Sequence, residues 1–233
     1  MIDIKEMLEK QKSDFSDLVR IMKILRTKDT GCPWDIEQTH KSIRNNFIEE
    51  AYEAVEGIDT GNDTLLCEEL GDVLLQVVFH AEIASDDGAF DINDVTDGIC
   101  KKLILRHPHV FGSVTVADSG EVLDNWDKIK RKEKNQKTLY KAVDDIARTM
   151  PSLMRIQKIR KKCEKAGSLS VSCASAVSVI EHELENVRES GTSPECISEM
   201  LCSVCDIARK NNIDAEQALY EKCEKLIDSQ KTG

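Results

Sequence analysis

Two short acidic motifs lie close together in the first half of the chain: Glu49-Glu50-x-x-Glu53 and, after a short gap, Glu69-x-x-Asp72. In a helix, residues three apart share a face, so each motif places carboxylates side by side. Two facing helices would bring about four carboxylates around one point, which is costly unless a cation meets them. Mg²⁺ is a hard ion that binds through carboxylates, water and substrate phosphates. We therefore expect a magnesium site here, with Mn²⁺ as the alternative ion.

The residues around the two motifs help to separate a metal site from a solvated surface. For the segment 49–56 alone, a solvated acidic helix face accounts for the sequence equally well. The helix that carries Glu69 and Asp72 should instead be largely buried, because apolar residues surround its polar stripe. These are Leu66, Leu70, Val73, Leu74, Val77 and Val78. A di-iron centre would need Glu-x-x-His motifs, and positions 56 and 75 are Glu and Leu, so iron is disfavoured.

The two motifs fall on helices that the sequence predicts from its periodicity and from Gly, Pro and Asp punctuation. Helices are expected in the first part of the chain at about 4–26, 39–58, 63–85, 91–106 and 119–134. A linker is expected at 135–143, followed by helices at about 151–166, 174–189, 194–210 and 215–229. β-type alternation does not persist anywhere in the sequence. The fold class is therefore predicted to be all-α.

Composition and charge narrow the class of protein. Of the 233 residues, 32% are charged and 4% are aromatic, and the formal net charge is −11. That charge argues against a nucleic-acid-binding surface, which needs a basic footprint. It is compatible with a nucleotide ligand, because a metal ion can reconcile acidic side chains with phosphates. A membrane span would need about 18 consecutive apolar residues, and the sequence has no such run. Met1 to Lys10 also lacks a signal-peptide pattern. We therefore expect a cytoplasmic protein.

The nine cysteines are interpreted as reduced thiols, because no secretory signal accompanies them. Cys202 and Cys205 form a CxxC motif, with Cys196 and Cys223 nearby. A structural zinc site is not favoured there, because a second tight pair is missing.

The acidic motifs together resemble those of the all-α nucleotide pyrophosphohydrolases, the group of MazG and the dimeric dUTPases. Three flanking stretches narrow the resemblance to MazG: Gly-Cys-Pro-Trp-Asp at 31–35, Arg-His-Pro-His-Val-Phe at 106–111 and Trp-Asp-Lys-Ile-Lys at 126–130. The resemblance extends from residue 17 to about 228 and implies two tandem helical-bundle repeats. We expect a catalytic repeat over 1–134, the linker over 135–143 and a degenerate second repeat over 144–233.

The resemblance implies a homodimer that hydrolyses nucleoside triphosphates to nucleoside monophosphate and pyrophosphate, in nucleotide-pool housekeeping. It implies four magnesium ligands: Glu50, Glu53, Glu69 and Asp72. Glu49 would bind a further ion or orient the attacking water. Substrate contacts would come from Lys102, Arg106, Trp126 and Lys130. Without the resemblance, Lys102 and Arg106 would be taken as surface residues, and Trp126 as core packing or an interface anchor.

The second repeat departs from the family pattern. Glu183-Leu-Glu-Asn186 and Glu199-x-x-Cys202 stand where the acidic motifs should recur, and the pairing of residues around Glu183 stays open. Asn186 lacks the charge of a ligand Glu, and the thiol of Cys202 is a poor ligand for a hard ion. We therefore expect one active site, in the first half. The alternatives are a nucleotide-binding regulator with negligible turnover and a helical interaction protein without a ligand.

Overall fold

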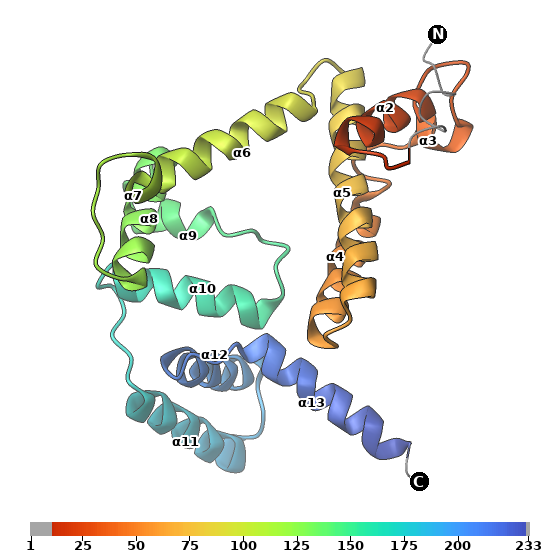
Figure 1. Cartoon of the computed structure of the whole chain (residues 1–233). Helices are drawn as coiled ribbons and strands as arrows, with labels where there is room; N and C mark the ends of the chain where they lie inside the picture. Colours follow the sequence, from red (N-terminus) through yellow and green to blue (C-terminus); the bar gives the residue numbers. More distant parts are fainter. Residues whose placement is uncertain (1–10, 232–233) are drawn as a thin grey trace. The chain divides into compact units, whose positions relative to one another are not determined.

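The structure is a computed structural model that describes residues 11–231. Within that range every regular element is an α-helix, which confirms the predicted fold class (Figure 1). The chain divides into two compact units, Met1–Thr115 and Val116–Gly233. None of the helices in the described range is long and apolar enough to cross a membrane. Two tandem repeats remain a prediction, since the division into units does not test internal similarity.

The first unit contains six helices among the described residues: α2 (Phe15–Leu25), α3 (Pro33–Glu37), α4 (Arg44–Asp59), α5 (Asp63–Asp86), α6 (Ile92–Arg106) and α7 (Pro108–Phe111). Asp14, Asn62 and Asp91 cap α2, α5 and α6 by accepting hydrogen bonds from first-turn backbone amides. Such caps satisfy donors that lack a partner within the helix. The predicted start of the first helix, near Ile4, lies outside the described residues.

Helix α4 begins later than the sequence predicted. Thr39 was expected to cap it, but Thr39 and Ser42 close a separate turn, in which each backbone amide donates to the other's hydroxyl. Ile43, only 2% exposed, directly precedes the helix and makes no side-chain cap. Burial of Ile43 in the core therefore fixes the start of α4 at Arg44.

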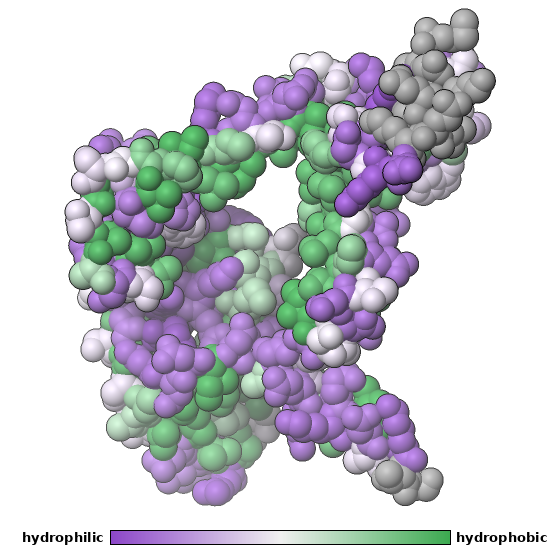
Figure 2. Space-filling view, in the orientation of Figure 1, coloured by the Kyte–Doolittle hydropathy of each residue, from purple (hydrophilic) through white to green (hydrophobic). Residues whose placement is uncertain are grey.

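Helices α4 and α5 form a hairpin that turns at Gly61, which has a left-handed φ of 63°. Gly57 allows the two helices to approach closely, since a Cβ there would lie 2.8 Å from the backbone nitrogen of Leu66. Helix α2 packs across α5 around a core of Met22, Ile43, Val78, Phe79 and Ile83. This arrangement leaves apolar side chains of α5 and α6 at the surface (Figure 2).

The second unit contains α8 (Ser119–Glu133), α9 (Leu139–Asp144), α10 (Ser152–Lys165), α11 (Cys173–Ser190), α12 (Pro194–Lys210) and α13 (Ala215–Gln230). The segment 135–143, expected as a linker, includes most of α9. Thr138 caps α9 by accepting from the amide of Lys141, and Ala142 is 3% exposed. Helix α8, expected with the first repeat, belongs to this unit. An ion pair joins Asp127 of α8 to Lys165 of α10.

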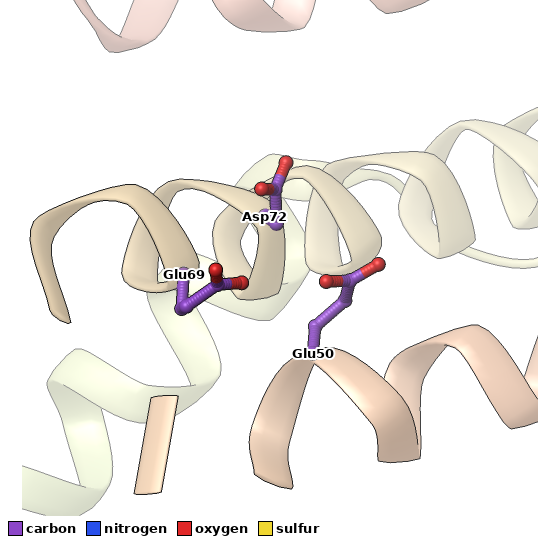
Figure 3. Close-up of side chains that lie close together, drawn as sticks. All are labelled: Glu50, Glu69 and Asp72. Atoms are coloured by element: carbon purple, nitrogen blue, oxygen red, sulfur yellow. The ribbon is translucent and has the colours of Figure 1, made fainter. Parts of the chain in front are cut away.

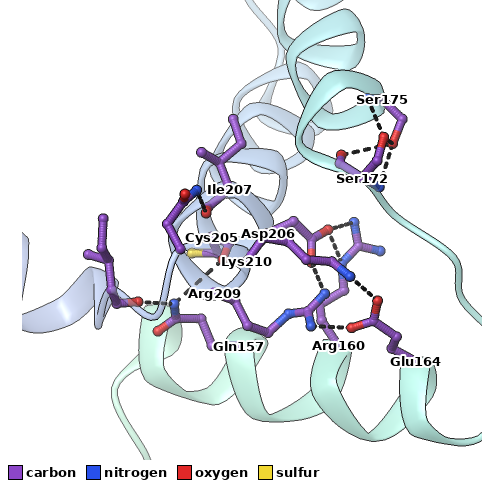
Figure 4. Close-up of polar contacts among 12 residues, drawn as sticks. Gln157, Arg160, Glu164, Ser172, Ser175, Cys205, Asp206, Ile207, Arg209 and Lys210 are labelled. Carbon is purple, nitrogen blue, oxygen red and sulfur yellow. Dashed lines mark hydrogen bonds and ion pairs between the residues drawn. The ribbon is translucent and has the colours of Figure 1, made fainter.

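A buried ionic network holds α10 against α12 (Figure 4). Asp206 is 1% exposed and accepts from Arg160 at 2.6 Å and from Arg209 at 3.0 Å. Glu164 of α10 in turn accepts from Arg209 and Lys210. A buried carboxylate is tolerated only when it is paired in this way. The polar centre of the second unit is therefore a set of neutralised charges.

Candidate metal centre

Three carboxylates converge between α4 and α5 (Figure 3). One oxygen from each of Glu50, Glu69 and Asp72 lies within 4.8 Å of the others. Among the described residues, this is the one group of His, Cys, Asp or Glu side chains that the structure brings so close together. Three oxygen ligands from two helices form a donor set that suits a hard divalent cation.

The α4–α5 hairpin positions the three side chains. Glu69 and Asp72 lie one helical turn apart on α5, and Glu50 reaches toward them from α4 (Figure 3). Glu69 is 9% exposed, whereas Glu50 and Asp72 are half-buried. The site is thus shielded on the Glu69 side and accessible near the other two carboxylates.

Among the described residues, the charges that act most strongly on Glu50 and Glu69 are all carboxylates. Burial, followed by repulsion from Asp72, Glu53 and Glu69, raises the pKa of Glu50. Burial, followed by repulsion from Glu53, Glu68 and Asp72, raises the pKa of Glu69. Like charges that converge without a neutralising partner disfavour the ionised form. A bound divalent cation would remove this repulsion, so the residues present fit Mg²⁺ or Mn²⁺.

The structure treats the two remaining acids of the motifs differently. Glu53 is half-buried and acts on both Glu50 and Glu69 through its charge and a hydrogen bond, so it lies next to the group. Glu49 is exposed and lines a shallow hollow together with Tyr52 and Glu53. Glu49 therefore faces more to the outside than the converging carboxylates.

The four residues expected to contact substrate divide between the two units. Lys102 and Arg106 lie in the second half of α6, whose first residue, Ile92, packs against the core. Trp126 and Lys130 lie on α8 in the second unit, where the Lys130 ammonium is 4.7 Å from the centre of the Trp126 ring. Within the first unit, neither Lys102 nor Arg106 is among the main causes of the pKa shifts of Glu50 and Glu69.

The sequence did not reveal a hollow of about 460 Å³ on the same hairpin. Its lining includes His40, Arg44, Phe47, His80 and Phe90. The Nδ1 atoms of His40 and His80 lie 2.9 Å apart and their rings stack at 9°. Burial and the charge of His40 lower the pKa of His80, which favours the neutral ring. Only the polar stripe containing His80 was visible in the sequence, since His40 meets it through tertiary structure.

The corresponding hairpin of the second unit, α11–α12, holds a different group. Asn186 donates to the Glu183 carboxylate at 3.1 Å, and the Cys196 thiol donates to the Glu183 carbonyl at 3.3 Å. Cys196 therefore lies against Glu183, a contact that the sequence analysis did not predict. Hydrogen bonds from Asn186 and Cys196 lower the pKa of Glu183, so this carboxylate is satisfied by the protein itself.

Comparison with known proteins identifies similar chains. The family described as MazG nucleotide pyrophosphohydrolase domain matches residues 38–111, the stretch that contains α4 and α5. The nucleoside triphosphate pyrophosphohydrolase of Escherichia coli strain K12 is 38% identical over 217 residues, which cover 90% of this chain and 82% of that protein. The nucleoside triphosphate pyrophosphohydrolase/pyrophosphatase MazG of Thermotoga maritima is 39% identical, over 92% of this chain and 83% of that protein.

Proposed function

The chain belongs to the MazG family of nucleotide pyrophosphohydrolases, and from that premise we propose that it hydrolyses nucleoside triphosphates to nucleoside monophosphate and pyrophosphate. The reaction is assigned to the α4–α5 hairpin. The observation that carries this assignment is the convergence of Glu50, Glu69 and Asp72 within 4.8 Å, where burial and mutual repulsion raise the pKa of Glu50 and of Glu69. The matched family segment includes all three residues.

Glu50, Glu69 and Asp72 would hold the divalent ion, with Glu53 beside them as the fourth ligand. Mg²⁺, or Mn²⁺ in its place, would neutralise phosphate charge and make a bound water more acidic. Glu49, on the outer side of the group, would orient the attacking water or contribute to a further ion. The half-buried Glu50 and Asp72 leave an accessible side for the triphosphate.

The cations assigned to the substrate would act on the leaving pyrophosphate. Lys102 and Arg106 lie one turn apart on α6, so both side chains can reach one anion. Phosphoryl transfer spreads charge over several oxygens, and fixed cations stabilise it without rearrangement. Lys130 would supply another cation and Trp126 an aromatic surface.

The hollow beside the hairpin offers a place for the base. Phe47 and the stacked His40–His80 pair give it flat apolar faces, and Phe47 precedes Glu50 by one turn of α4. Aromatic faces bind a base by stacking and discriminate weakly between bases. This geometry supports binding of a nucleotide base without dictating which one.

We expect the active form to be a cytoplasmic homodimer that acts in nucleotide-pool housekeeping. Large apolar side chains are exposed along α4 and α6, including Tyr52, Ile58, Ile99 and Leu103. Exposed apolar side chains of this kind favour association between subunits. The net charge of −11 gives no support to a nucleic-acid partner.

The test is a product-resolved assay of a panel of nucleoside and deoxynucleoside triphosphates, with Mg²⁺ and with EDTA. We expect monophosphate and pyrophosphate with Mg²⁺, and no turnover in EDTA. Orthophosphate and diphosphate as the first products would contradict cleavage between the α and β phosphates. Metal-dependent binding without products would instead identify a nucleotide-binding regulator.

A further inference from the structure

The second unit contains a basic pocket in a chain whose overall charge is strongly negative. The pocket has a volume of about 160 Å³ and lies between α8, the turn that follows it and α10. Its lining carries six cationic side chains: Lys130, Arg131, Lys158, Lys161, Lys162 and Lys165. Asp127 is the one carboxylate in the lining. The formal charge around this small volume is therefore about five positive units, against −11 for the whole chain.

The ion pairs in this region leave much of that charge uncompensated. Lys165 pairs with Asp127 and also lies 3.7 Å from Asp124. For Lys158, Lys161 and Lys162, no carboxylate lies within 4.0 Å in the part of the chain that the structure describes. Cations brought together without counter-charges repel one another at a cost to the fold. An anion in the pocket would relieve that cost.

The pKa values of Lys162 and Asp127 in the lining are both shifted. Burial, and then repulsion from Arg131, lowers the pKa of Lys162. Burial alone would raise the pKa of Asp127, yet the hydrogen bond and charge of Lys165, with the charges of Lys161 and Lys162, hold it below its usual range. The Asp127 shift expresses the positive potential of the surrounding lysines. The Lys162 shift is caused first by burial and is opposed by the charges of Asp127 and Asp145.

From this geometry we infer that this pocket of the second unit binds the diphosphate or triphosphate group of a small ligand. Clustered lysines around an enclosed volume match an anion with several charged oxygens, since each ammonium donates charge-assisted hydrogen bonds. The volume is smaller than the roughly 300–1,000 Å³ typical of pockets that enclose whole small-molecule ligands. The pocket therefore takes a phosphate chain, and any base or sugar stays outside it.

Two sources could supply this chemistry: a nucleoside triphosphate, or free pyrophosphate. The site does not depend on the proposed hydrolysis, because none of its residues is a proposed metal ligand. Lys130 alone is shared with the proposed substrate contacts, so the variants below leave it intact.

The test is calorimetric titration of the full chain with inorganic pyrophosphate and with a non-hydrolysable triphosphate analogue, both in EDTA. EDTA removes the divalent ions that would attach either probe to the carboxylates of the first unit. We expect the wild type to bind at least one probe, and Lys161→Gln/Lys162→Gln to weaken that binding by about tenfold or more. Tighter binding of pyrophosphate would identify the free ion as the source, and tighter binding of the analogue would identify the nucleotide.

The control is Lys222→Gln/Lys225→Gln on α13, which changes the net charge equally at exposed positions and should leave affinity within about twofold. Lys158→Gln serves as a second, exposed pocket variant. Asp127→Asn should tighten binding severalfold, a gain that misfolding cannot produce. The inference fails if the wild type binds neither probe, if the pocket variants bind as well as the control, or if equimolar sulfate displaces the probe.

Discussion

The α4–α5 hairpin of the first unit and the α11–α12 hairpin of the second each place a glutamate against the partner helix. In α4–α5, Glu50 faces two further carboxylates, and its pKa is raised by burial and like charge. In α11–α12, the Glu183 carboxylate accepts from the Asn186 amide, the Glu183 backbone carbonyl accepts from the Cys196 thiol, and the pKa of Glu183 is lowered. Two similar helical hairpins therefore shift the pKa of a glutamate in opposite directions.

The difference shows how a glutamate can be satisfied by the protein itself. Asn186 supplies a donor where a second carboxylate would repel Glu183, so Glu183 needs no positive partner. The second unit also has a paired Asp206 in its centre. Its polar groups are paired, whereas the carboxylates of α4–α5 repel one another.

The largest expected contrast is in turnover. Glu69→Ala should lower kcat/KM by several hundredfold or more, because it removes a proposed ligand. Glu199→Ala, on α12, should leave activity within about twofold, as exposed substitutions usually do. Both variants are assayed with Mg²⁺ at equal fold content by circular dichroism. If Glu199→Ala is the inactive variant, the active site has been assigned to the wrong unit.

The next contrast is in stability of the second unit. Asp206→Asn leaves Arg160 and Arg209 without their shared carboxylate, and should cost about 3–5 kcal/mol. Asp144→Asn, the same substitution in an exposed pair with Arg148, should cost at most about 1 kcal/mol. Urea unfolding measures both. Equal losses would show that the buried network does not stabilise this unit.

In the metal-free first unit, removing a carboxylate charge should increase stability, whereas removing the Asp206 charge should decrease the stability of the second unit. Glu69→Gln should raise the melting temperature by a few degrees at pH 7, because the raised pKa of Glu69 means that its ionised form destabilises the fold. The wild-type protein is destabilised as pH rises through the folded pKa of Glu69, because Glu69 then ionises. The melting temperatures of the two proteins should therefore converge toward pH 4. Thermal melts in EDTA at both pH values test this, with exposed Glu56→Gln as the control. A difference in melting temperature that persists unchanged at pH 4 would show that packing, and not the charge of Glu69, causes the effect.

The smallest expected effect tests whether a second carboxylate can give α11–α12 the charge repulsion found in α4–α5. Asn186→Asp replaces the donor to Glu183 with a second charge, and should lower the melting temperature slightly at pH 7. The low pKa of Glu183 in the native protein gives stability above its unfolded pKa, and that stability is lost as pH falls. The variant should therefore resemble wild type most closely near pH 4. An unchanged melt at pH 7 would mean that the Asn186 hydrogen bond contributes nothing.

Local sequence signals predicted much of the helical framework. Asp91, Ser193 and Asp214 cap helices where expected, because capping depends on a few adjacent residues. The assignment of α8 to a unit could not be predicted, since it rests on contacts such as Asp127 with Lys165, which are distant in sequence.

In the candidate site too, features set by local sequence could be predicted and contacts between distant residues could not. Apolar neighbours predicted that the helix carrying Glu69 would be largely buried, and this is correct only in part. Glu69 and Val78 are buried, whereas Leu70 and Leu74 are 53% and 40% exposed. The pairing of His40 with His80, and of Cys196 with Glu183, depends on the register between two helices. Spacing within one helix carries no information on that register, so these contacts were missed.

The close approach of α4 and α5 at Gly57 has a consequence for ion size. Because a Cβ at this position would meet the Leu66 backbone at 2.8–2.9 Å, any larger residue must move one helix away from the other. Mg²⁺ requires short, nearly octahedral coordination, whereas Ca²⁺ accepts longer and more flexible geometry. Gly57 thus sets the spacing between the helices that carry the proposed ligands, and under the proposed function this spacing would favour the smaller ion.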